Sequence, residues 1–193
     1  FSIYKRYIIY YCMQILVANI KGGCGKSTLV SALADLLDAD IIDHDNQGTI
    51  RVSSSFTGLR VPVTYEKITK KIVLHDTPPY NTGNLKSLIQ EVDLILIPCK
   101  LMYPDLLALR ALSDELKKLN MTQKAVIVFN EIRKPHNNTY KEVKALYESN
   151  YSEIKKAKTE LSNLISFSRV LSEPVTGKAL EQVKSLISEL SIY

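Results

Sequence analysis

A glycine- and lysine-rich segment near the N-terminus is the part of the chain best suited to chemistry. It spans residues 21–28, follows an apolar run at 15–18 and opens a helical pattern. Glycines between a strand and a helix let backbone N–H groups approach phosphate oxygens, and the first helical turn adds unpaired N–H groups. In such a loop Lys26 would reach the β- and γ-phosphates of a nucleotide, and the Ser27 hydroxyl would bind Mg²⁺.

Polar side chains also follow three later apolar runs. Asp43 and Asp45 come after a short run of isoleucines, and Asp76 ends another run. Asn130 follows a third. Because the C-terminal ends of parallel strands meet at one edge of a sheet, we expect these side chains to lie beside the glycine-rich loop. Solvated turns are the alternative for the carboxylates.

Three motifs resemble those of the ParA/MinD superfamily of ATPases, closest to its short ParA-type partition ATPases. Residues 21–28 resemble the deviant Walker A box, Lys-Gly-Gly-x-Gly-Lys-Ser-Thr. Residues 43–48, Asp-His-Asp-Asn-Gln-Gly, resemble the family's Asp-x-Asp-x-Gln-Gly motif. Residues 76–79, Asp-Thr-Pro-Pro, resemble its Walker B and switch segment. The resemblance runs from about Met13 to the C-terminus.

The resemblance implies an ATP hydrolase that uses Mg²⁺ and forms a homodimer in the ATP state. In this family the early lysine, here Lys21, crosses the dimer interface to the partner's nucleotide. Asp45 would orient the attacking water, and the catalytic residues would be Lys21, Lys26 and Asp45. The metal would be held by Ser27, Asp43 and Asp76, the last through a metal-bound water. The expected nucleotide-binding residues are Gly22, Gly23, Cys24, Gly25, Lys26, Ser27, Thr28, Asn130, Pro174 and Val175.

Some of these assignments have plain alternatives. Asn130 resembles the family's adenine-reading asparagine, but it would also suit a helix or turn cap. Pro174 and Val175 resemble the loop that stacks on the base, or form an ordinary turn. A position at a helix N-terminus beside lysines would lower the pKa of Cys24, although we expect this thiol to be a bystander.

The overall composition suits one α/β domain. The chain has 193 residues, of which 46% are hydrophobic and 23% charged, and this supports a single core. Its three cysteines fit a reducing cytoplasm and lack metal-binding spacing. No apolar run reaches the roughly 18 residues of a membrane span. We expect Met13 to be the natural start, with residues 1–12 an extension and 13–193 a single P-loop ATPase domain.

Apolar runs typical of strands alternate with runs at helical spacing. This predicts an α/β fold with a mostly parallel twisted sheet and helices on both faces, the fold of P-loop NTPases. The expected strands are 15–18, 41–42, 72–75, 94–97 and 125–129, with a minor strand at 61–63 and an edge strand at 154–161. The expected helices are 27–37, 48–56, 84–91, 105–119, 138–150 and one from Gly177. Pro98 is expected to end its strand.

The favoured function is a switch in plasmid or chromosome partition that binds DNA non-specifically. A net charge of +5 and a pI of about 9.0 permit contact with the phosphate backbone. The candidate DNA-binding residues are Arg169, Lys155, Lys156 and Lys178, with solvated helix faces as the alternative. A centromere-binding ParB-like protein would be the stimulating partner.

Three other functions stay open. A MinD-like positioning ATPase would need a basic amphipathic helix, whereas residues 177–193 balance Glu181 and Glu189 against Lys178 and Lys184. We therefore expect no stable membrane association, and a cytoplasmic location with nucleoid association if DNA binding holds. A small-molecule P-loop ligase or kinase would not need Lys21 for dimerisation. A nucleotide-dependent scaffold would show no ATP turnover.

Overall fold

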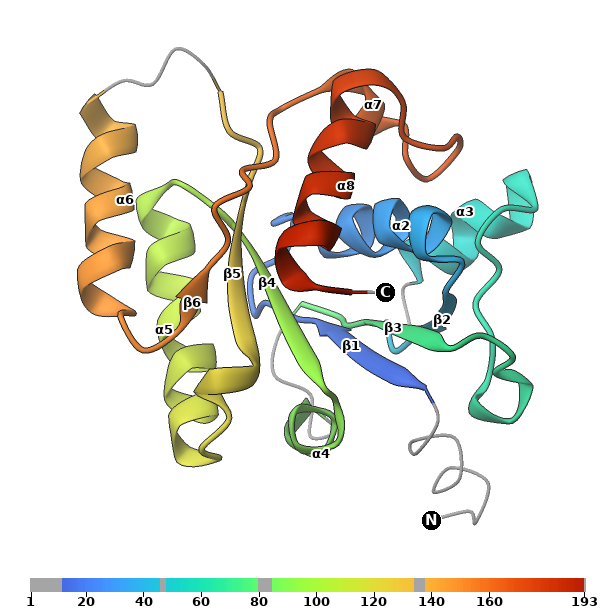
Figure 1. The fold of residues 1–193 in the computed structure, drawn as a ribbon, viewed down its shortest axis with the longest axis horizontal. Helices are drawn as coiled ribbons and strands as arrows, with labels where there is room; N and C mark the ends of the chain where they lie inside the picture. The colour runs from blue at the N-terminus through green and yellow to red at the C-terminus, as the bar shows by residue number, and fades with distance from the viewer. Residues whose placement is uncertain (1–11, 46–47, 80–84, 134–137, 193) are drawn as a thin grey trace.

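A six-stranded sheet runs through the centre of the computed structural model, which describes residues 12–45, 48–79, 85–133 and 138–192 (Figure 1). The strands stand in the order β2-β3-β1-β4-β5-β6, and every neighbouring pair is parallel. This confirms the predicted parallel α/β fold. The strands are β1 (Met13–Val17), β2 (Asp40–Asp43), β3 (Ile72–Asp76), β4 (Leu94–Lys100), β5 (Ala125–Asn130) and β6 (Lys155–Lys156).

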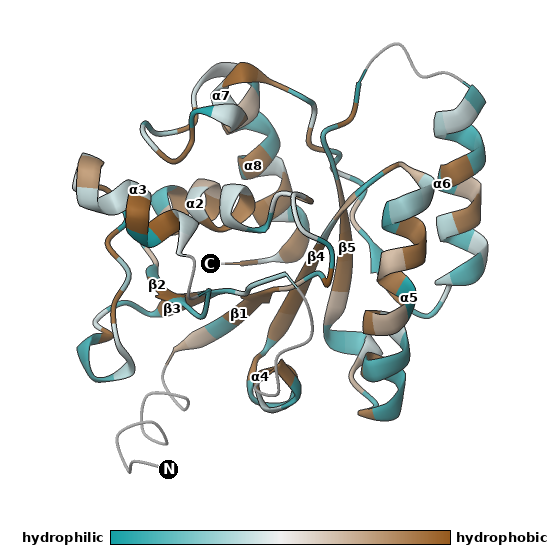
Figure 2. Ribbon diagram, turned by 180° about the vertical axis from the view of Figure 1, so that it is seen from behind, coloured by the Kyte–Doolittle hydropathy of each residue, from teal (hydrophilic) through white to brown (hydrophobic). Residues whose placement is uncertain are grey.

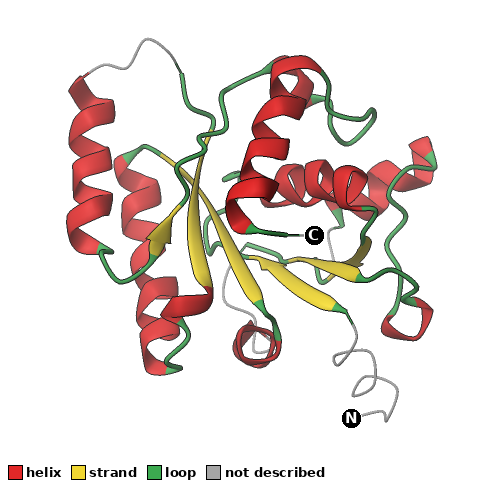
Figure 3. Ribbon diagram, in the orientation of Figure 1, coloured by secondary structure: helices red, strands yellow, loops and turns green. Residues whose placement is uncertain are grey.

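Helices cover both faces of the sheet, as Figure 3 shows. One face carries α2 (Lys26–Leu37), α7 (Ile165–Ser168) and α8 (Gly177–Leu190), and α3 (Thr49–Thr57) packs on the same side. The opposite face carries α4 (Leu85–Glu91), α5 (Tyr103–Lys118) and α6 (Asn138–Asn150). Two short 3₁₀ helices, η1 (Tyr65–Lys67) and η2 (Thr122–Lys124), lie in the connections.

The strands are apolar because they are buried on both faces. In β1, Ile15 and Val17 belong to the core cluster under α2 and α8, whereas Leu16 belongs to the cluster under α4, α5 and α6. This alternation follows from the two-residue period of a strand. Figure 2 shows β4 and β5 as largely apolar ribbons between their covering helices.

The central strand β1 lies at the point where the chain changes direction across the sheet. From β1 the chain passes through α2 to β2 on one side, and from β3 it passes through α4 to β4 on the other side. Connections that leave neighbouring strands in opposite directions open a crevice at the C-terminal edge of the sheet. The glycine-rich segment after β1 enters this crevice.

The prediction that Pro98 ends its strand is wrong, because β4 continues to Lys100. β4 pairs with β1 only as far as Leu96, and further pairing is with β5 on the other side. The carbonyl of Pro98 faces the β1 side, where it accepts a hydrogen bond from Asn19 Nδ2 at 2.9 Å. The missing N–H of the proline also faces that side, so it costs no ladder hydrogen bond.

Two other predicted strands differ from the structure. Residues 61–63 form no strand, and only the N–H of Val63 bonds to the neighbouring β2, at the carbonyl of Ile41 (2.8 Å). Pro62 lacks the donor that a longer ladder would need. The edge strand expected at 154–161 is reduced to β6, and α7 was not predicted at all. The extension expected at residues 1–12 lies almost wholly outside the described residues.

Candidate nucleotide-binding site

The glycine-rich loop has the backbone conformation that its glycines predict. Gly23 and Gly25 have φ angles of +70° and +96°, in the left-handed region that favours glycine. Gly25 precedes α2, and its carbonyl accepts the N–H of Leu29 at 2.9 Å. The loop lines a hollow of about 270 Å³, whose walls comprise Gly22, Gly23, Gly25, Lys26, Ser27, Thr28, Asp45, Thr49, Thr77, Pro79 and Leu171.

The sequence reading missed two buried side chains near the loop: Asn19 ties the loop to β4, and Thr77 ties the end of β3 to β1. Asn19 accepts the N–H of Lys21 at Oδ1 (3.0 Å), and its Nδ2 donates to the carbonyl of Pro98 in β4. Thr77 donates its hydroxyl to the carbonyl of Val17 at 2.9 Å. Their positions in the sequence could have indicated them, because both follow the C-terminal ends of central strands, where ligands bind.

Ser27, which lines the hollow, contacts Asp76 at the end of β3. The Ser27 hydroxyl donates to Asp76 Oδ2 at 2.7 Å. Burial raises the pKa of Asp76 to about 7, although the Ser27 hydrogen bond opposes the rise. The second carboxylate oxygen, Oδ1, is buried and has no hydrogen-bond partner among the described residues. A buried carboxylate with one unsatisfied oxygen is suited to a cation.

Asp43 lies beside Asp76, because the two residues are in register at the ends of β2 and β3. Its Oδ1 accepts the N–H of Asp45 at 2.9 Å, whereas its Oδ2 is buried with no partner among the described residues. Burial also raises the pKa of Asp43. Asp45 follows in the same turn and lines the hollow.

These residues fit Mg²⁺ as part of a shared site. Within the described part of the chain, no group of three or more His, Cys, Asp or Glu side chains is arranged to hold a metal ion on its own. Mg²⁺, however, keeps several waters and commonly takes one or two carboxylates together with phosphate oxygens. The unsatisfied oxygens of Asp43 and Asp76, with the Ser27 hydroxyl, offer that donor set.

The two loop lysines have different surroundings. Lys26 is buried, and its ammonium donates to the carbonyl of Lys21 at 3.2 Å, inside the loop. Lys21 turns away from the loop and forms an ion pair with Asp105 in the first turn of α5. The Asp105 side chain is fully buried, and its Oδ1 also accepts the N–H of Lys100 at 3.3 Å.

Asp105 was missed because α5 begins earlier than predicted. The helix starts at Tyr103 with Pro104 in its first turn, where a proline is tolerated. This start places Asp105 inside the first turn, directed at the lysine, instead of at an exposed helix end. Like Asn19, it follows a central strand at the ligand-binding edge of the sheet.

Two histidines connect the segment after β2, residues 43–45, to the core. His44 Nε2 lies 2.9 Å from His75 Nδ1, and His75 Nε2 lies 2.7 Å from Gln14 Oε1. The N–H of His44 also bonds to the carbonyl of Asp76 at 2.9 Å. These contacts hold the turn that carries Asp45 against β3.

The residues predicted to contact the base are not brought together. Val175 is buried in the core, and Pro174 lines a different hollow beside Asp38 and Arg60. Asn130 lies under the glycine-rich loop. For Cys24, burial raises the pKa of the thiol, and this effect outweighs the opposing charge of Lys26 that sequence reasoning had invoked.

The four predicted DNA-binding residues fall into two groups. Lys155 and Lys156 form β6 at the edge of the sheet, whereas Arg169 and Lys178 lie at the end of α7 and the start of α8, above α2 in Figure 1. Arg169 is exposed, with Glu173 3.7 Å away. Lys156 is partly buried and donates to the carbonyl of Tyr151, which leaves it less suited to phosphate contact.

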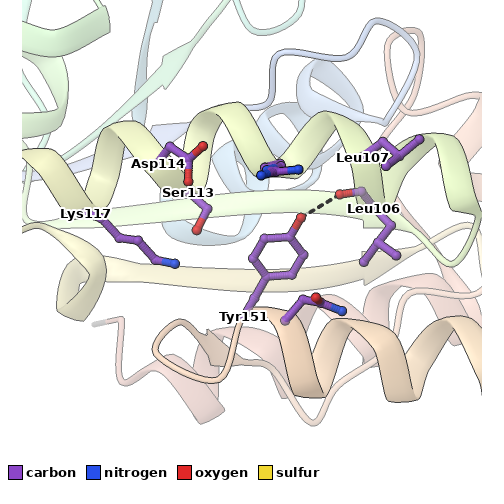
Figure 4. A pocket seen from close by; sticks show the side chains of 8 residues that line it. Leu106, Leu107, Ser113, Asp114, Lys117 and Tyr151 are labelled. Atoms are coloured by element: carbon purple, nitrogen blue, oxygen red, sulfur yellow. Dashed lines mark hydrogen bonds between the residues drawn. The ribbon is translucent and has the colours of Figure 1, made fainter.

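A second hollow, of about 420 Å³, lies between α5 and the end of α6 (Figure 4). Tyr151 closes one side by donating its hydroxyl to the carbonyl of Leu106 at 2.7 Å. Lys117, on its wall, is paired with Glu153 at 2.5 Å. The lining residues include no glycine loop and only one carboxylate, that of Asp114, so the smaller hollow at the switch point is the stronger candidate site.

The parallel sheet with a glycine loop at its switch point defines an α/β protein of the P-loop class. A sequence profile of the CobQ/CobB/MinD/ParA nucleotide binding domain matches residues 15–176, and the chain belongs to this family. The predicted relationship to the ParA/MinD-type ATPases is thereby confirmed. No curated protein sequence matched the chain.

Solved structures with the same fold cover nearly the whole chain. A putative plasmid partition protein from Borrelia burgdorferi bound to AMPPNP has a TM-score of 0.75 at 16% identity, over 93% of this chain and 98% of that one. A variant of McdA from Cyanothece in complex with ATP has a TM-score of 0.71 at 12% identity, over 95% of this chain and 98% of that one. The septum site-determining protein MinD from Pyrococcus horikoshii complexed with Mg-ADP has a TM-score of 0.64 at 14% identity, over 94% of this chain and 96% of that one.

Proposed function

We propose that this protein is a Mg²⁺-dependent ATPase that dimerises when it holds ATP and acts as a switch in DNA partition. The observation that carries the proposal is a single hollow lined by the glycine loop, Lys26, Ser27 and Asp45, with Asp76 hydrogen-bonded to Ser27. Phosphoryl transfer to water needs charge neutralisation, a metal and an oriented water. The hollow offers groups for each requirement.

The loop would bind the phosphates of ATP through its backbone N–H groups and Lys26. Lys26 now donates to the carbonyl of Lys21, and a phosphate oxygen would replace that weaker neutral acceptor with a charged one. Ser27, Asp76 and Asp43 would hold Mg²⁺, which would neutralise charge on the phosphate oxygens. A cation would also satisfy the buried carboxylate oxygens and favour the ionised form of Asp76.

Asp45 would orient the attacking water, since its side chain borders the hollow and its turn is fixed by the bond of its N–H to Asp43. Lys21 would leave Asp105 and reach the nucleotide of the partner subunit. The homodimer would then depend on ATP, and hydrolysis would dissolve it.

Partition is favoured over a MinD-like role by the environment of α8. Its apolar residues Ala179, Val183 and Leu186 are buried in the core, and Glu189 accepts the N–H groups of Lys158 and Thr159. This leaves no free apolar face on α8 for a bilayer. Among the described residues, no helix has the length and apolar character needed to cross a membrane. A ParB-like protein would stimulate hydrolysis, and the ATP dimer would associate with the nucleoid.

The proposal is tested by measuring phosphate release from ATP and the oligomeric state with ATP, with ADP and without nucleotide. We expect Mg²⁺-dependent turnover and a dimer in ATP alone. Turnover without dimerisation would favour a small-molecule enzyme, and dimerisation without turnover would favour a scaffold.

Asp45→Ala should abolish ATP hydrolysis while leaving ATP binding intact, because the phosphate loop and the metal ligands are unchanged. The variant should therefore accumulate as a longer-lived ATP dimer than the wild type. Size-exclusion chromatography with ATP, together with a phosphate-release assay, measures both effects. Asp114→Ala, at an exposed carboxylate of α5, is the control. An Asp45→Ala variant that stays monomeric in ATP would contradict the assignment.

Arg169→Ala combined with Lys178→Ala should weaken DNA binding more than Lys155→Ala combined with Lys156→Ala. Arg169 lies two residues before Leu171, which lines the nucleotide hollow, whereas Lys156 is engaged with Tyr151. Each lost phosphate contact should reduce the slope of log K against log salt concentration by about 0.9 in magnitude. Filter binding to random-sequence duplex, with ATP and with ADP over a salt series, measures this slope. Equal binding by all variants in both nucleotide states would mean that these cations only solvate the surface.

A further inference from the structure

We infer that Asn130 is a positioning residue of the phosphate loop. It holds the Cys24–Gly25 peptide in the orientation that binds a polyphosphate, whatever base the ligand carries. This rests on the proposed function, because it concerns the same nucleotide site. It assigns Asn130 a different task from the adenine reading that its resemblance suggested. The first observation is that both ends of its side-chain amide are engaged within the protein.

Asn130 ends β5 and is 5% exposed. Its Nδ2 donates to the carbonyl of Cys24 at 3.0 Å, across 106 residues of sequence. Its Oδ1 accepts the N–H of Glu131 at 2.8 Å. To read a base with this amide, the side chain would have to give up both buried hydrogen bonds. The loss of each would leave a buried polar group unsatisfied.

The second observation is the fit between Asn130 and Gly25. A Cβ placed on Gly25 would lie 2.1 Å from Asn130 Nδ2, well inside the contact distance of the two atoms. The absence of a side chain at this position therefore admits the asparagine amide as well as satisfying a φ of +96°. Loop and asparagine are packed as one unit.

This packing has a direct consequence for phosphate binding. The carbonyl of Cys24 and the N–H of Gly25 belong to one planar peptide and point in opposite directions. By holding the carbonyl on its own side, Asn130 turns the N–H of Gly25 to the other side. It thereby prevents a peptide flip that would present a carbonyl oxygen to the phosphates.

The same side chain is itself fixed at the end of β5. Glu131 has a left-handed backbone with a φ of +54°, which is uncommon for a residue with a side chain. The hydrogen bond from its N–H to Asn130 Oδ1 and its ion pair with Lys100 at 2.7 Å hold this turn. Asn130 thus attaches the glycine-rich loop to the end of β5 through a side chain that is itself held in place.

The test compares affinities for Mg-ATP, Mg-GTP and inorganic tripolyphosphate, measured by calorimetry on the full chain. Asn130→Ala should weaken all three by a similar factor of about three to ten, the value of one neutral hydrogen bond. Asn130→Asp keeps the acceptor for Glu131 but places an oxygen against the Cys24 carbonyl, so its losses should be equal or larger. Asn150→Ala, at an exposed asparagine in α6, should change nothing.

Each other outcome has a defined meaning. A loss confined to ATP would show that Asn130 reads adenine, and unchanged affinities would show that it is a bystander; both overturn the inference. A wild-type protein that binds none of the three ligands would instead defeat the proposed function. Thermal unfolding of each variant checks folding, and loss of cooperative unfolding in both Asn130 variants would assign the residue to the core and also overturn the inference.

Discussion

Asp76→Asn should make the nucleotide-free protein more stable while removing the proposed Mg²⁺-dependent nucleotide binding and hydrolysis. The asparagine keeps an oxygen that can accept from the Ser27 hydroxyl, but it carries no charge that must be buried. With the pKa of Asp76 raised from 3.8 to about 7, the gain at high pH is on the order of 4 kcal/mol. Such an exchange of stability for function is common at active sites.

The pH dependence distinguishes this effect from a general improvement in packing. Between 3.8 and about 7 the folded protein holds a proton on Asp76 that the unfolded chain has lost. Wild-type stability should therefore fall as the pH rises through this window, and the advantage of Asp76→Asn should grow and then level off above about 7. Urea unfolding at a series of pH values, without Mg²⁺, measures it. Asp114→Asn is the control, and a pH-independent difference would refute the interpretation.

Lys21→Ala and Lys26→Ala should fail in different ways. Lys21→Ala should still bind ATP but lose ATP-dependent dimerisation and hydrolysis, because in the proposed dimer its ammonium would act on the nucleotide of the partner subunit. Lys26→Ala should lose affinity for the nucleotide itself, since Lys26 lines the hollow. Nucleotide affinity by calorimetry and oligomeric state by size-exclusion chromatography separate the two. An equal loss of affinity in both variants would contradict this division of roles.

The Lys21 experiment needs a second variant. Removing Lys21 leaves the fully buried Asp105 carboxylate without its cation, at a cost of about 3 kcal/mol. Lys21→Ala combined with Asp105→Asn removes that charge as well. We expect the double variant to regain the lost stability and to remain monomeric in ATP. Recovery of the dimer in the double variant would show that only the unpaired carboxylate had prevented assembly.

The phosphate loop and the strand-end carboxylates could be predicted because their chemistry is local. Gly23 and Gly25 have positive φ angles, which glycine adopts without help from distant residues. Asp43 and Asp76 each end a short apolar run that forms a buried strand. The parallel sheet with helices on both faces followed from the alternation of strands and helices. These features depend on short stretches of sequence.

The missed features depend on contacts between distant segments. Asp105 is defined by an ion pair across 84 residues and Asn19 by a hydrogen bond across 79. The extension of β4 through Pro98 depends on which neighbour its missing N–H faces, and this direction is set only when the sheet is assembled. Propensity also favoured a minor strand near Pro62, but tertiary structure provides no partner ladder there.

The packing of α8 beside α2 has a consequence for the order in which the chain folds. Val183 and Leu186 share a core cluster with Leu29 and Leu33 of the helix that follows the phosphate loop. During synthesis, α2 therefore keeps exposed apolar surface until α8 leaves the ribosome. Such non-local packing slows folding, so we expect the nucleotide pocket to form only after α8 has been synthesised and to depend on chaperones when α8 is weakened.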